Sequence, residues 1–154
     1  MRAKIWVWAL AALVFASAHM IASAQQSAVV QHVKFGILRL MANGEYELDR
    51  ETARIPRRYK SSGFRFGVAF DNPSGARIEW YEVVHLPAKP RQLSGDLRQV
   101  KPTVLQTDTL TGNDRRIVDN FWFDDGDPLG PHRFELYVNG VKQWETAFEV
   151  VEPR

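Results

Sequence analysis

Most of this chain alternates apolar and polar residues in short runs, and turn-forming residues separate the runs. The clearest run covers residues 64–70, where the even-numbered positions are all large and apolar: Phe64, Phe66, Val68 and Phe70. A period of two is the pattern of a β-strand with one buried face. After residue 24 we find no stretch with the 3.6-residue period of an amphipathic helix. The pattern therefore predicts an all-β protein.

The same reasoning predicts further strands over residues 29–41, 45–49, 76–86, 103–110 and 116–123, with a long connection over 87–102. In the first of these strands the apolar phase changes after Ile37, which predicts a bulge near Gly36. The last two strands form a hairpin around Asn139-Gly140. If Phe134 and Trp144 face the same core, the loop spans residues 138–140, with a type I turn, a bulge and Gly140 in the left-handed region.

About seven short strands in a chain of this size are typical of an immunoglobulin-like antiparallel β-sandwich, and a small β-barrel is the alternative. We expect a single domain over residues 31–152, preceded by a disordered start at 25–30. Trp80 shares its phase with Ile78 and Val84 and is expected in the core. The aromatic residues expected at the surface are Tyr59, Tyr81 and Tyr137.

Residues 1–24 have the pattern of an export signal. Arg2 and Lys4 precede an apolar run at 5–18, and Ala22-Ser23-Ala24 fits the small-residue cleavage pattern. The apolar run is shorter than the roughly 18–20 residues that a membrane span needs. We therefore predict cleavage near Ala24, a periplasmic or secreted mature protein that begins at Gln25, and no membrane span in the mature chain.

Composition narrows the possible chemistry. The 154 residues include no cysteine, which excludes disulfides, thiolate metal sites and a cysteine nucleophile. The net charge of +2 comes from Arg2 and Lys4, so the mature chain is neutral. A neutral chain has no overall attraction to nucleic acid, and we expect no nucleic-acid partner.

Two blocks of the chain resemble a bacterial family catalogued as domain of unknown function 3859. The first is Ile55-Pro56 followed by Gly63-Phe64-Arg65-Phe66; the second comprises Phe121-Trp122-Phe123-Asp124, residues 130–134, Asn139-Gly140 and Phe148-Glu149-Val150. The resemblance covers roughly residues 33–151, and His132 departs from it where that family has an aromatic residue. It implies an exported β domain and supplies no activity, cofactor or catalytic residue.

Candidate metal ligands are few. Asp124, Asp125 and Asp127 surround Gly126 and are weak candidates for calcium ligands, but the EF-hand spacing is absent and a plain turn has the same composition. The histidines His32, His85 and His132 are far apart in the sequence and lack metal-ligand spacing. We predict no metal site and no cofactor.

The most basic stretch covers residues 50–65, and its Arg54, Arg57 and Arg58 are the candidate contacts for an acidic partner. A solvated loop, or a loop paired with the chain's own acids, is the alternative. The chain shows no Gly-x-Ser-x-Gly, His-Glu-x-x-His or phosphate-binding glycine motif.

The function we predict is that of an exported, non-catalytic binding or accessory module for a protein or an acidic envelope partner. The partner would bind at the arginines, at the 87–102 connection or at an open sheet edge. A divalent-ion or glycan-binding domain is the alternative, and a small hydrolase is a further one.

Overall fold

The computed structural model of the protein describes residues 29–93 and 97–153. The predicted signal peptide lies outside the described residues. The described chain begins within the segment 25–30 that we predicted as disordered. There, Val30 is 4% exposed and the Val29 N–H donates to Gln143 Oε1 at 2.9 Å. No helix in the described part is long and apolar enough to cross a bilayer.

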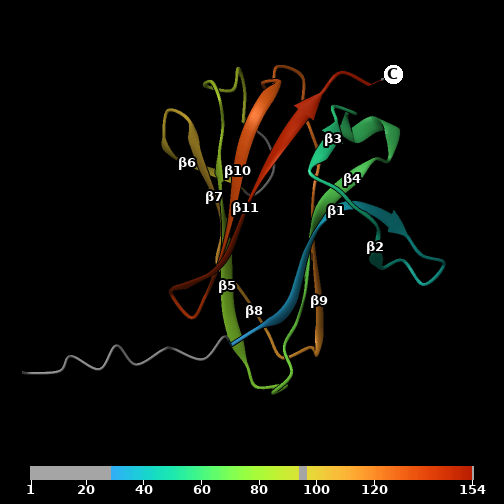
Figure 1. Ribbon diagram of the computed structural model, residues 1–154, viewed down its shortest axis with the longest axis vertical. Helices are drawn as coiled ribbons and strands as arrows, with labels where there is room; N and C mark the ends of the chain where they lie inside the picture. The colour runs from blue at the N-terminus through green and yellow to red at the C-terminus, as the bar shows by residue number, and fades with distance from the viewer. Residues whose placement is uncertain (1–28, 94–96, 154) are drawn as a thin grey trace, which may run out of the picture.

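The described strands form two sheets that lie face to face (Figure 1). The four-stranded sheet has the order β2-β1-β4-β9, and its strands are β1 (Gln31–Leu40), β2 (Tyr46–Glu51), β4 (Arg65–Asp71) and β9 (Arg116–Phe121). The seven-stranded sheet has the order β3-β11-β10-β5-β7-β6, with β8 also paired to β5. Its strands are β3 (Arg54–Pro56), β5 (Ile78–His85), β6 (Leu97–Lys101), β7 (Val104–Thr107), β8 (Leu110–Gly112), β10 (Gly130–Val138) and β11 (Val141–Val151).

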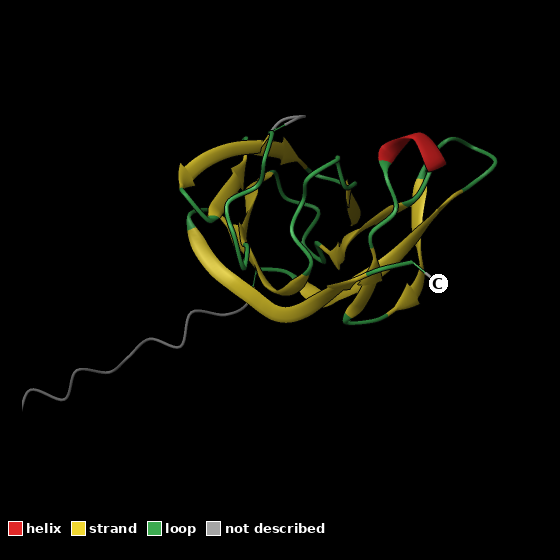
Figure 2. Cartoon of the chain, turned by 90° about the horizontal axis from the view of Figure 1, so that it is seen from above, coloured by secondary structure: helices red, strands yellow, loops and turns green. Residues whose placement is uncertain are grey.

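All of these pairings are antiparallel except that of β3 with β11, which is parallel. One short 3-10 helix, η1 (Lys60–Ser62), connects β3 to β4 in the described chain. Both views place this helix at the same end of the molecule as the C-terminus (Figures 1 and 2). The fold is the predicted all-β sandwich, with more and shorter strands than the sequence pattern indicated.

Aromatic rings fill the space between β1 and β4 of one sheet and β10 and β11 of the other. The Phe35 ring lies 5.2 Å from that of Phe134 and 4.8 Å from that of Phe148, and Phe66 stacks on Phe123 at 4.5 Å. All of these side chains are buried, and all but Phe123, which follows β9, occupy inward positions of their strands. This dense cluster is the main hydrophobic core of the domain.

Two glycines allow neighbouring strands of the four-stranded sheet to approach closely. Gly36 of β1 and Gly67 of β4 are cross-strand neighbours. A Cβ atom at Gly67 would overlap the carbonyl oxygen of Asp119, and one at Gly36 would overlap that of Arg50. The neighbouring strands thus approach the glycines too closely for any side chain. The predicted bulge lies next to Gly36, where the β1–β2 register shifts between Ile37 and Leu38.

The C-terminal hairpin corrects one prediction. Val138 pairs with Val141, so the loop has two residues rather than three, and Asn139 and Gly140 both have positive φ, of 50° and 77°. These are the dihedral signs of a type I′ turn, which matches the twist of the strands. The register shifts further along, between Leu136 and Tyr137. That bulge keeps the even-numbered positions of both strands on the core face, as predicted, and Gly140 is left-handed, as predicted.

Three short strands, β3, β6 and β8, were not predicted as separate strands. β3 is short and basic, and β6 lies inside the predicted 87–102 connection, where Leu97 and Val100 are its only apolar residues. The predicted strand 103–110 is divided into β7 and β8 at Asp108-Thr109. Periodicity cannot detect such strands, because they hold too few inward-facing residues to repeat a pattern.

Candidate functional site

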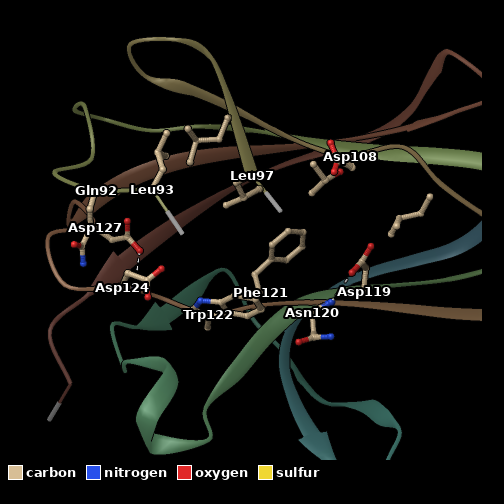
Figure 3. A pocket seen from close by; sticks show the side chains of 13 residues that line it. Gln92, Leu93, Leu97, Asp108, Asp119, Asn120, Phe121, Trp122, Asp124 and Asp127 are labelled. Atoms are coloured by element: carbon tan, nitrogen blue, oxygen red, sulfur yellow. Dashed lines mark hydrogen bonds between the residues drawn. The ribbon is translucent and has the colours of Figure 1, made fainter. Parts of the chain in front are cut away.

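The two sheets stay apart on one side of the sandwich, where a pocket of about 280 Å³ opens between β9 and the β6–β7 edge. Figure 3 shows Leu93 and Leu97 on one wall, with Phe121 and Trp122 facing them from the other. Leu105 and Leu110 complete the apolar lining. A smaller void of about 50 Å³ shares Leu97, Leu105, Phe121 and Trp122 and continues into the core beside Phe134. The pocket is therefore an opening into the space between the sheets.

Carboxylates lie at both ends of this apolar pocket. Asp124 and Asp127 stand at one end in Figure 3, and Asp108 and Asp119 at the other. At the first end the Asp124 N–H donates to Asp127 Oδ2 at 2.7 Å. Burial raises the pKa of the Asp127 carboxyl above its ordinary value, and that hydrogen bond opposes the shift. The ends of the pocket are thus acidic and its middle is apolar.

A buried carboxyl stands behind the second end. Glu82 of β5 is fully buried, and its Oε2 accepts a hydrogen bond of 2.8 Å from the hydroxyl of Thr107, which lines the pocket. No donor within the described residues reaches its Oε1, and the Glu82 side chain forms a hydrogen bond with the Asp119 carboxyl. Burial, and next the neighbouring Asp119 charge, hold the pKa of Glu82 well above its usual range. Asp119 Oδ2 in turn accepts from Trp80 Nε1 at 3.3 Å.

Sequence reasoning missed Glu82 and its pairing with Asp119. The signal was present, because Glu82 shares the even phase of Ile78, Trp80 and Val84, which we had assigned to the core. An acid at an inward position of an apolar strand indicates either a buried polar network or a site. Asp119 was grouped with Asp124, Asp125 and Asp127 as one acidic segment, and nothing in the sequence connected it to Glu82.

The three arginines of the predicted basic surface do not form one cluster of unpaired charge. Arg54 Nε lies 3.4 Å from Glu149 Oε2. Arg57 donates to Glu152 Oε1 at 2.8 Å and to the carbonyl oxygen of Asp127 at 3.0 Å. Arg58 is exposed. Two of the three thus contact the chain's own acidic residues, which is the arrangement we gave as the alternative to a partner surface.

The structure places Asp124, Asp125 and Asp127 in one turn, as the sequence suggested. Asp125 is exposed, whereas the Asp127 carboxylate accepts from the Asp124 backbone and so closes the turn. Gly126 has a φ of 93°, which a glycine adopts without strain. Within residues 29–93 and 97–153 no group of three histidine, aspartate or glutamate side chains is placed to hold a metal ion.

The three predicted histidines lie in separate environments. His32 Nδ1 is 2.8 Å from Asp71 Oδ2, and His85 Nε2 is 3.3 Å from Glu135 Oε1 on the outer face of the seven-stranded sheet. His132 is 5% exposed and packs on Phe148, with ring centroids 5.0 Å apart. Burial lowers the pKa of His132. This histidine takes the place of the expected aromatic residue.

The aromatic residues expected at the surface are partly exposed. Tyr59 is exposed, and Tyr81 and Tyr137 are half-buried cross-strand neighbours whose rings stack at 4.8 Å. One ring face of each stacked tyrosine is therefore already occupied by the other. Trp80 is buried, as predicted.

Two sheets packed face to face around an aromatic core define an immunoglobulin-like β-sandwich. The fold is similar to that of an immunoglobulin-like protein from Pseudomonas aeruginosa, with a TM-score of 0.50 and 13% sequence identity over 79% of this chain and 96% of that chain. The model of the PM0630 beta sandwich domain matches residues 33–151, and the chain belongs to this family. No curated protein matches the chain.

Proposed function

We propose that this protein is an exported, non-catalytic binding module that holds part of a protein partner in the pocket between β9 and the β6–β7 edge. One observation carries the proposal: the pocket opens at the surface and continues toward the core through shared apolar residues. Apolar concave sites with a few polar groups are the usual places for ligands. Leu93 and Leu110 at the pocket are 44% and 40% exposed, so apolar surface is available to a partner there.

The arrangement of the acids supports a non-catalytic role. Glu82 and Asp119 are interacting carboxyls at the pocket wall, but Glu82 is fully buried and bonded to Thr107. A general acid or base must reach the proton that it transfers. We infer that this pair shapes the wall of the pocket and does no acid–base chemistry.

Export is the second component of the proposal. It rests on the pattern of residues 1–24, and the finer resemblance to domain of unknown function 3859 also implies an exported protein. The expected result is that the mature protein, recovered from the periplasm or medium of its host, begins at Gln25. N-terminal sequencing tests this, and an uncleaved chain in the membrane fraction would contradict it.

Pocket binding is tested with an uncharged pentapeptide, acetyl-Gln-Leu-Val-Leu-Gln-amide, and the isotope-labelled mature protein. Amide and indole NMR signals are recorded during the titration. We expect shifts at Leu105, Phe121 and the Trp122 indole, which belong to the lining. Absence of shifts, or shifts confined to Arg54, Arg57 and Arg58, would overturn the assignment of the pocket as the binding site.

Matched tryptophan variants locate the binding. Leu110→Trp and Leu93→Trp each fill the pocket from a different segment, and we expect both to remove the shifts. Leu40→Trp is the control, because Leu40 is 57% exposed and lies on β1, away from the pocket. Thermal melting of all three variants shows whether the fold is retained. Equal binding by the folded pocket variants and the control would contradict the proposal.

A further inference from the structure

We propose that the carboxyls of Glu82 and Asp119 form a pH-sensitive latch, which holds β9 against the seven-stranded sheet and keeps the pocket in its binding shape. This inference rests on the proposed function and adds the regulation of the same site. It follows from where the two carboxyls stand, from the hydrogen bonds that each of them makes, and from the position of β9 at the edge of its sheet.

The pair joins the two sheets at one end of the pocket. Glu82 belongs to β5 of the seven-stranded sheet, Asp119 belongs to β9 of the four-stranded sheet, and their side chains form a hydrogen bond. Trp80 of β5 also donates from Nε1 to Asp119 Oδ2 at 3.3 Å. Among the described strands, β9 pairs only with β4 and so has a free edge. These side-chain bonds therefore tie an edge strand to the opposite sheet, and Asp119 itself lines the pocket.

The other hydrogen bonds of the pair show which carboxyl holds a proton. Two carboxylates cannot bond to each other, because neither has a hydrogen to donate. Asp119 is an acceptor on both oxygens, for the Asn120 N–H at 2.9 Å and for Trp80 Nε1. Glu82 Oε2 accepts from the Thr107 hydroxyl at 2.8 Å, and no donor within the described residues reaches Oε1. Glu82 is therefore the protonated partner, and it donates to Asp119.

Loss of this proton opens the latch. Burial, and next the Asp119 charge, raise the pKa of Glu82, so the proton is held to a higher pH than on an ordinary glutamate. When the pH rises above that pKa, two negative charges face each other beside a fully buried side chain and repel. The edge strand β9 moves away, and its Phe121 withdraws from Leu97 and Leu105 across the pocket. The pocket then loses its apolar contact with a ligand.

The side chains around the pair do not offset this repulsion. Opposite Glu82, β10 presents Leu136, and opposite Asp119, β4 presents Val68. Asp108, which directly follows β7, is exposed at the same end of the pocket (Figure 3). Within the described residues, no lysine, arginine or histidine lines the pocket. No basic side chain of the lining therefore stabilises the pair once both carboxyls are charged.

Two other groups near the pocket also titrate. Asp124 and Asp127 stand at the opposite end, in a turn on which Arg91 packs. Burial raises the pKa of Asp127, whereas the hydrogen bond from the Asp124 N–H and the charge of Arg57 lower it. His132 borders the smaller void, and burial lowers its pKa. The titrations of Asp127 and His132 must therefore be separated from that of the latch.

The test uses the pentapeptide acetyl-Gln-Leu-Val-Leu-Gln-amide, which has no titratable group, and the mature protein. Its affinity is measured by NMR titration between about pH 5 and 8.5. We expect the affinity to fall about tenfold as the pH rises, because Glu82 loses its proton. In the protein without peptide, the Trp80 indole signal should shift over the same pH interval, since this N–H donates to Asp119.

Glu82→Gln is the decisive variant, because its amide keeps a donor for Asp119 and an acceptor for Thr107 but cannot titrate. We expect it to bind the peptide equally well at both ends of the pH range, and thermal melting shows whether it is folded. Asp119→Asn is the second variant, which removes the other charge and should also flatten the pH profile. The controls Asp127→Asn and His132→Phe should keep the wild-type ratio of affinities between the two ends of the range.

The outcomes distinguish the latch from the binding site. Peptide binding of equal strength at all pH values, or a Trp80 indole signal that does not move, would overturn the latch and leave the pocket assignment intact. A wild-type decline in both folded latch variants, or its loss in a control variant, would also overturn the latch. Absence of peptide binding at every pH would overturn the pocket assignment together with the latch.

Discussion

The two sides of this sandwich are built from the same kind of strand, but one side is closed by packed aromatic rings and the other is open. On the closed side, Phe35 of one sheet packs between Phe134 and Phe148 of the other, and all three rings are buried. On the open side, β9 and the β6–β7 edge leave a pocket of about 280 Å³. The difference lies in which residues occupy the inward positions, since both sides belong to the same two sheets.

The open side shows what polar residues at inward positions do to a sandwich. Glu82, Thr107 and Asp119 take places where the closed side has phenylalanine. Carboxyls cannot pack as densely as rings, and burying them costs free energy unless they are hydrogen-bonded. We therefore expect the closed side to contribute more to stability than the open side.

Phe134→Ala should reveal the largest difference between the two sides, which is a difference in how much the free energy of unfolding falls. Phe134 is fully buried at the centre of the aromatic cluster, and its removal should lower the free energy of unfolding by about 3–5 kcal/mol. Leu93→Ala is the comparison on the open side, where 44% exposure predicts a loss of less than about 1 kcal/mol. Urea denaturation of both variants measures the contrast, and equal losses would contradict it.

A smaller loss is expected when an alanine replaces Gly67. The new Cβ would overlap the Asp119 carbonyl oxygen, so β9 must move away from β4, at a cost of about 1–3 kcal/mol. Because Asp119 and Phe121 of β9 line the pocket, the peptide affinity should fall too. Denaturation and peptide titration of the same variant test both effects. Unchanged stability would show that the close approach of β9 to β4 does not depend on this glycine.

Glu82→Gln should change how stability depends on pH on the open side. Burial raises the pKa of Glu82 in the folded state, so the folded chain holds a proton that the unfolded chain has already released. Stability is therefore greatest at acid pH and falls as the pH rises toward the folded-state pKa. Thermal melts of Glu82→Gln between about pH 4.5 and 8 should lack this decline. A wild-type slope in the variant would contradict the assignment.

On the closed side, His132→Phe should have the opposite effect on the pH dependence of stability. Burial lowers the pKa of His132, so the folded chain resists a proton that the unfolded chain accepts. Stability is present above the ordinary histidine pKa of about 6.5 and decreases as the pH falls below it. Phenylalanine packs on Phe148 without titrating, and melts between about pH 7 and 5 should decline less in the variant. An identical acid decline in both proteins would exclude His132 as its cause.

The sequence predicted the closed side better than the open one. In residues 64–70 and the C-terminal hairpin, large apolar residues recur at every second position, because those side chains enter one continuous core. The hairpin loop was assigned three residues because periodicity shows which face is buried but not where a bulge lies. The Asn139-Gly140 signal for a two-residue turn was the better guide to the turn itself.

The pocket on the open side could not be predicted from the sequence, for a physical reason. Part of its walls comes from β6, β8 and the segment around Leu93, which are too short to show a period. The aspartates of the pocket are separated in sequence, with Asp108 before β8 and Asp127 after β9, and only the folding of the sheets brings them to one opening. The most visible charges of the sequence, Arg54 and Arg57, instead contact the chain's own acids.

The most direct test of the binding pocket is site-specific photo-crosslinking in the cells that produce the protein. A benzoylphenylalanine is placed at Leu110 in the pocket, at Arg58 in the basic stretch, or at Leu40 on β1. The account predicts an adduct from position 110 alone, whose partner peptide, identified by mass spectrometry, is apolar. An adduct from position 58 or 40 with none from position 110 would contradict it.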